Sequence, residues 1–128
     1  MSDLQSPIAL QAQRAAKALL ADLDGASAVV IATVDGFDLA HAGSRAIEPA
    51  RLAAMVSSLA ALGDAASRET GIGTPRCLVV ESTEGRLVLR CIQARGESLV
   101  IVLLTDKSVL LGLVWNRLAA AEQWMNAA

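Results

Sequence analysis

The sequence predicts an α+β fold in which a five-stranded antiparallel sheet carries helices on both faces. Strand-like segments occur in two groups, two before and three after a long amphipathic helix, and short turns join the strands within each group. Helical stretches open and close the chain, so the expected order of elements is α-β-β-α-β-β-β-α. The chain has 128 residues, and we expect residues 1–128 to form a single domain.

The first helix is expected to begin at Ser6-Pro7, because a hydroxyl cap followed by proline favours a helix start. Apolar residues then recur at helical spacing until Asp24-Gly25. The first strand is predicted over 28–33. The pair Asp35-Gly36 tolerates positive φ angles, which predicts a two-residue hairpin turn into a short second strand that ends at His41.

The second helix is expected to begin at Pro49 and to end before the glycine-rich loop at residues 70–75. Many of its residues are small, so another backbone could approach it closely. Its large apolar residues are predicted to share one side: Leu52, Met55, Val56, Leu59 and Leu62.

Three strands are predicted next, over 76–83, 86–93 and 98–105. A two-residue turn at Glu84-Gly85 would pair Leu78 with Cys91 and point Cys77 and Cys91 to opposite faces. A three-residue turn would instead place the two cysteines opposite each other.

Ser108 is expected to cap the last helix. In that helix Trp115 is expected in the core, and Trp124 is a candidate exposed contact residue.

The polarity of the strands predicts their order in the sheet. Residues 99–104 are all apolar and residues 28–32 nearly so, which is typical of central strands covered on both faces. Since hairpins keep neighbouring strands together, the expected order is 2-1-5-4-3. The strand over 76–83 is then an edge without proline or lysine to discourage pairing, so we expect it to mediate self-association.

Composition excludes several classes of function. The net charge is −2 and only three residues are aromatic, so neither a phosphate-binding surface nor a base-stacking platform is expected, and nucleic acid is excluded as a partner. The longest apolar runs are far shorter than the roughly 20 residues that span a bilayer, and no membrane association is expected. The N-terminus lacks the features of a signal peptide, which predicts a cytoplasmic protein with reduced cysteines.

Reactive residues do not form a recognisable constellation. His41 has no identified orienting carboxylate or nucleophile, and Asp35 is explained by the turn. Two cysteines and one histidine lack the spacing of a zinc site, and Gly71-Ile72-Gly73 precedes a strand rather than opening a helix. We therefore expect no catalytic, metal-binding or cofactor-binding residues, and no enzymatic activity.

Taken in order, the motifs resemble the Roadblock (dynein light chain) domain family. The resemblance covers nearly the whole chain. It is carried by Gly25, by Val29-Val30-Ile31 leading into 35–39, by the hairpin over 79–87, and by Leu110-Leu111-Gly112-Leu113.

This resemblance implies a non-enzymatic homo- or heterodimer whose fold is related to profilin-like and longin domains. Members of the family join edge to edge through the third strand and pack their second helices together. Bacterial members similar to MglB are partners, in some cases GTPase-activating regulators, of Ras-like small GTPases. Any stimulation would come from positioning the GTPase's own catalytic groups, since the family is not characterised by an arginine finger supplied in trans. Carried over to this chain, the dimer interface would comprise Arg51, Met55, Ser58, Leu62, Cys77, Val79 and Glu81.

Two functions of different classes follow. The first is a homodimeric regulatory or scaffold module for a small Ras-like GTPase. The second is a small-molecule sensor, because related α+β sheets can hold a ligand between sheet and helix. A cavity lined by Met55, Trp115 and polar side chains would favour the sensor.

Overall fold

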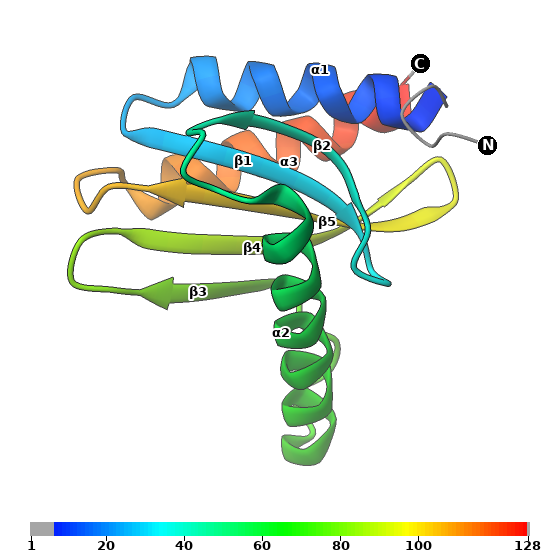
Figure 1. Ribbon diagram of the computed structural model, residues 1–128. Coiled ribbons are helices and arrows are strands. Elements are labelled where there is room, and N and C mark those ends of the chain that lie inside the picture. Colours follow the sequence, from blue (N-terminus) through cyan, green and yellow to red (C-terminus); the bar gives the residue numbers. More distant parts are fainter. Residues whose placement is uncertain (1–6, 128) are drawn as a thin grey trace.

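A computed structural model describes residues 7–127 of the chain and confirms the predicted architecture (Figure 1). The proposed cap at Ser6 lies outside the described residues. The elements are α1 (Pro7–Asp22), β1 (Ala26–Thr33), β2 (Asp38–Gly43), α2 (Pro49–Thr70), β3 (Cys77–Glu81), β4 (Arg86–Ala94), β5 (Glu97–Thr105) and α3 (Leu111–Ala127).

The five strands form one antiparallel sheet in the predicted order β2-β1-β5-β4-β3. Helices α1 and α3 cover one face, and α2 crosses the other (Figure 1). The central strands β1 and β5 supply residues to both cores. Val29 and Leu103 belong to the cluster under α1 and α3, whereas Val30 and Val102 belong to the cluster under α2. Burial of β5 on both faces therefore explains its continuous apolar run.

The turn between β1 and β2 differs from the predicted two-residue form. The Gly36 N–H donates to the Thr33 carbonyl at 3.0 Å, and the Thr33 N–H donates to the Phe37 carbonyl at 2.8 Å. These bonds enclose a three-residue loop, in which Gly36 takes a φ of +97°. The glycine thus follows a β-turn as the left-handed residue of a bulged hairpin, and Asp35 needs no positive φ. His41 lies inside β2, paired with Val30, and not at its end.

The register between β3 and β4 matches neither predicted turn. Leu78 pairs with Leu89 and Cys77 with Arg90, and the Ser82 N–H donates to the Gly85 carbonyl at 2.9 Å. The turn residues are therefore 83 and 84. A Cβ on Gly85 would lie 2.5 Å from the Thr105 carbonyl oxygen, so this glycine permits close approach of two strands instead of forming the turn.

Because the pairing differs from the two-residue prediction by two positions, every side chain keeps its predicted face. Leu78, Leu87 and Cys91 contact the cluster under α2, as expected. Cys77 and Cys91 lie on opposite faces and are both free thiols.

The predicted cap of α3 is wrong. The Ser108 N–H and hydroxyl both donate to Asp106 Oδ1, at 2.9 and 2.6 Å, in a turn that follows β5. Helix α3 begins later, at Leu111, and its early N–H groups on Leu113 and Val114 donate to the Leu110 carbonyl. A serine that satisfies a preceding aspartate is not available as the helix cap.

Candidate protein-interaction site

The free edge of the sheet is β3, and its outward backbone groups can be assigned from the hydrogen bonds to β4. The Cys91 N–H donates to the Arg76 carbonyl, and Ser82 bonds Gly85, so Arg76 and Ser82 belong to hydrogen-bonded pairs. Such pairs alternate along an antiparallel ladder. Cys77, Val79 and Glu81 therefore direct their N–H and C=O groups away from β4. Among residues 7–127 none hydrogen-bonds these outward groups, so the edge is open to another strand.

The side chains of the same three residues lie on the face that carries α1 and α3. Val79 is half-buried and packs against the larger core cluster. Glu81 is exposed and forms an ion pair with Arg86, whose guanidinium also donates to the Val109 carbonyl. Cys77 is half-buried beside Arg90. Val79 is thus an apolar centre with a thiol on one side and a charged pair on the other.

The large apolar residues of α2 share one side of the helix, as predicted, but they differ in burial. Val56 is fully buried, and Leu52 and Leu59 pack against the sheet. Met55 and Leu62 lie at one margin of this apolar side and are 58% and 67% exposed. They continue a solvent-facing row, here called the α2 stripe, consisting of Arg51, Met55, Ser58 and Leu62. The spacing of three or four residues keeps the row on one helix face.

The α2 stripe and the β3 edge meet at the same border of the molecule. Leu59, Ala60 and Gly63 of α2 line a small cavity of about 20 Å³ together with Cys77 and Leu78 of β3. In Figure 1 the helix continues beyond β3, past the limit of the sheet. The second half of α2 therefore projects from the open edge. The structure thus places all seven residues of the expected interface on two adjoining elements.

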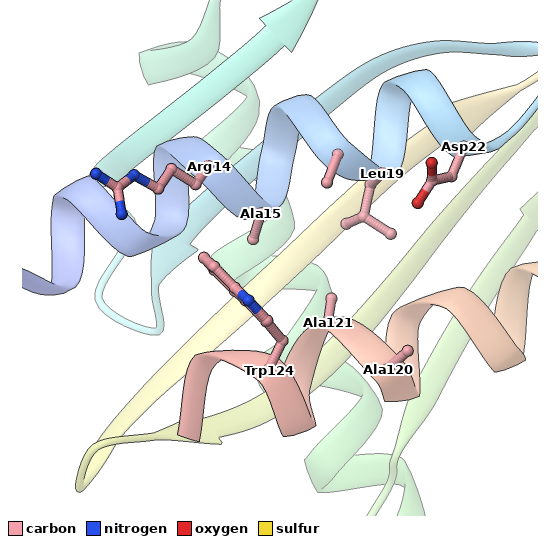
Figure 2. Close-up of a pocket in the computed structure, with 8 residues that line it drawn as sticks. Arg14, Ala15, Leu19, Asp22, Ala120, Ala121 and Trp124 are labelled. Atoms are coloured by element: carbon pink, nitrogen blue, oxygen red, sulfur yellow. The ribbon is translucent and has the colours of Figure 1, made fainter. Parts of the chain in front are cut away.

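A groove lies on the opposite face of the sheet, between α1 and α3 (Figure 2). It measures about 220 Å³, and Trp124 of α3 extends across it toward α1, near Arg14 and Ala15. The indole is 46% exposed, as expected for this residue, whereas Trp115 packs against the core. Arg14 and Asp22 are the charged residues of the groove lining.

A larger cleft of about 380 Å³ lies between α2 and the ends of β4 and β5. Its polar side chains come from Ser57, Asp64, Thr74, Gln93 and Ser98. Met55 and Trp115 do not line it. These two residues belong to helices on opposite faces of the sheet and cannot share a cavity. The arrangement that would favour a sensor is therefore not present.

The titratable groups in the described part of the chain offer no metal site, and two of them have a shifted pKa. Within residues 7–127 no group of three or more His, Cys, Asp or Glu side chains could hold a metal ion. Burial, together with the nearby Cys77 and Asp64, raises the pKa of the Cys91 thiol, so this cysteine is a poor nucleophile. Hydrogen bonds from Ser108 lower the pKa of Asp106, which lies in the turn between β5 and α3. None of the helices described is both long and apolar enough to cross a membrane.

Together, the three helices and the five-stranded sheet form a small α+β domain with an open β3 edge beside the exposed α2 stripe. The chain belongs to the Roadblock/LC7 domain family, whose family model matches residues 13–105, from within α1 to the end of β5. Helix α3 lies beyond the matched segment. No curated protein is significantly similar to the chain in sequence.

Solved structures share this fold at low sequence identity. A Roadblock/LC7 domain from Streptomyces avermitilis is 20% identical with a TM-score of 0.78, and the alignment covers 87% of this chain and 91% of that one. The gliding protein MglB from Thermus thermophilus is 22% identical with a TM-score of 0.77, covering 96% and 91%. An MglB with a tetrameric arrangement is 23% identical with a TM-score of 0.78, covering 96% and 90%.

Proposed function

We propose that two copies of this chain pair through β3 and α2, and that the resulting homodimer is a regulatory or scaffold module for a small Ras-like GTPase. The open β3 edge beside the exposed α2 stripe is the observation that carries the proposal. Membership of the Roadblock/LC7 family and the likeness to MglB structures support it.

The outward groups of β3 define how two copies would pair. An antiparallel pair centred on Val79 lets Val79 exchange both main-chain hydrogen bonds with its own copy. Cys77 would then lie opposite the partner's Glu81, and Glu81 opposite the partner's Cys77. Such a pair is isologous and joins two five-stranded sheets into one continuous sheet.

The α2 stripe would complete the contact. Because α2 projects past β3, a twofold axis at Val79 brings the two projecting helices toward each other. Burying Met55 and Leu62 there would remove two of the most exposed large apolar side chains of the described chain from water. Small neighbours such as Ala54, Ser58 and Ala61 would allow close helix approach.

The partner is inferred from the family. Bacterial relatives similar to MglB act on Ras-like GTPases, and a dimer would present one continuous sheet and a helix pair as a docking surface. The protein would act by positioning the GTPase's own catalytic groups. Two free thiols fit the reducing cytoplasm in which such GTPases work.

The test uses the Ras-like GTPases of the organism that encodes this chain, each loaded with GTP or GDP. We expect at least one of them to copurify with the protein, or to change its single-turnover GTP hydrolysis rate when the protein is added. A dimerisation-deficient variant should lose the effect. A stable dimer that neither binds nor alters any of these GTPases would refute the GTPase role while leaving the dimer intact.

A further inference from the structure

The second edge of the sheet, β2, is covered by a side chain from α1. Gln13 Nε2 donates to the His41 carbonyl at 2.9 Å, and the His41 N–H donates to Gln13 Oε1 at 3.3 Å. One primary amide thus satisfies both the donor and the acceptor of a single strand residue. A neighbouring strand makes the same pair of bonds in an antiparallel ladder.

The hydrogen-bond pattern shows that these groups of His41 point outward. The Ser44 N–H donates to the Ser27 carbonyl at 2.9 Å, which makes Ser27 and Ser44 a hydrogen-bonded pair of the β1–β2 ladder. By alternation, Val30 and His41 form a pair that does not exchange bonds, so His41 directs its N–H and C=O away from β1. Gln13 therefore occupies the position that an incoming strand would take, at the middle of β2.

The two edges of the sheet consequently differ. At β3 the outward N–H and C=O groups of Cys77, Val79 and Glu81 make no hydrogen bond with any of residues 7–127. At β2 the outward N–H and C=O of His41 are already hydrogen-bonded to Gln13. Natural sheets commonly block an edge to prevent unwanted pairing. Here one edge is blocked and the other left open.

We propose that Gln13 closes the β2 edge against strand addition by a second copy of this chain, so that sheet pairing through β3 ends with two copies. The inference rests on the proposed β3 dimer. Two isologous contacts on opposite edges of one sheet would alternate without closing, and the result would be an open-ended filament. A covered β2 edge removes the second contact and keeps the assembly finite.

The test replaces Gln13 with methionine, which preserves length and helix propensity but cannot form the hydrogen bonds. Gln123→Met is the matched control, because Gln123 is an exposed residue of α3. Mass is measured by light scattering from micromolar to millimolar concentration, and exchange of the His41 amide proton is followed by NMR in dilute samples. Gln13→Asn, whose amide is too short to bridge to β2, is a second variant if Gln13→Met does not fold.

We expect the average mass of Gln13→Met to grow with concentration to roughly twice that of wild type or more, while Gln123→Met stays at the wild-type mass. The His41 amide should exchange faster in the dilute Gln13 variant. Adding Val79→Lys to Gln13→Met should limit growth to a pair joined through β2.

Faster His41 exchange without any gain in mass would overturn the proposal, because the edge would then be uncovered and still not pair. Unchanged His41 exchange would overturn it as well, since Gln13 would not be protecting that group. A monomeric wild type with a dimeric Gln13→Met would instead refute the β3 dimer and support the role of Gln13.

Discussion

Replacing Val79 with lysine should convert the proposed dimer into a monomer. Val79 is the middle of the three β3 residues whose backbone groups point outward, so the twofold axis of the pair passes beside it. Each substitution therefore acts twice, once in each copy. The side chain is half-buried, and lysine can extend its ammonium group to water in the monomer, so the fold should survive.

The structure sets the size of the effect. Each copy loses the burial of the remaining exposed part of a valine, about 1 kcal/mol, so the pair loses about 2 kcal/mol. Two ammonium groups near the axis, about 6 Å apart at an effective dielectric constant between 20 and 80, repel by roughly 1–3 kcal/mol. The sum, about 3–5 kcal/mol, corresponds to a rise in the dimer dissociation constant of between about 10² and 10⁴.

Sedimentation velocity across a concentration series measures this constant directly. Val34→Lys is the matched control, because Val34 is 42% exposed in the β1–β2 loop, away from the β3 edge. The thermal midpoint of each variant, followed by circular dichroism, shows whether the monomer remains folded. A wild-type monomer at micromolar concentration would contradict the reasoning. So would a Val79→Lys variant that dimerises with unchanged affinity.

Two further substitutions test separate parts of the structure. Leu62→Glu should weaken the dimer about tenfold or more, because it removes apolar burial from both copies of the α2 stripe. The control is Leu10→Glu, on the opposite face of the sheet, which should leave the dimer unchanged. If sedimentation shows equal effects of the two substitutions, α2 is not part of the contact. Ser108→Ala should raise the pKa of Asp106 toward its ordinary value, because the hydroxyl hydrogen bond is the main cause of its low pKa. Since the pKa of Asp106 is lower in the folded state than in the unfolded state, ionised Asp106 stabilises the fold above its unfolded pKa, and this stabilisation is lost as pH falls through its folded pKa. An NMR titration of Asp106 that is unchanged in Ser108→Ala would contradict the expectation.

The sheet order could be predicted because burial on both faces leaves a direct trace in the sequence. An uninterrupted apolar run in β5 and a nearly uninterrupted one in β1 place these strands centrally, and hairpin connections then leave β2 and β3 at the edges. The turns were less predictable. The sequence places Gly85 in the connection between two predicted strands, whereas in the structure its absent side chain makes room for the Thr105 carbonyl. That approach involves a strand 20 positions distant and is invisible to local patterns.

The position of β3 at an edge of the sheet was predictable, but the burial of the individual α2 side chains was not. Helical periodicity groups Met55 and Leu62 with Val56 and Leu59, because a wide apolar arc on a helix does not show where the underlying sheet ends. Gln13 could not be identified from sequence at all. Its role depends on α1 overhanging β2, and a glutamine among alanines otherwise indicates only a good helix former.

The two parts of the proposed interface cannot be interchangeable, as their energies show. Three outward residues in each copy give main-chain hydrogen bonds with a net value of roughly 0.5–1.5 kcal/mol each, so all of them together are comparable with the roughly 4–15 kcal/mol that association costs. Covering the exposed portions of Met55 and Leu62 in both copies adds about 4–8 kcal/mol. Backbone bonds are also the same for any strand, so β3 by itself would accept any extended segment. In the proposed dimer, the β3 bonds would therefore fix the antiparallel geometry of the pair, whereas its preference for a second copy would come from the α2 stripe.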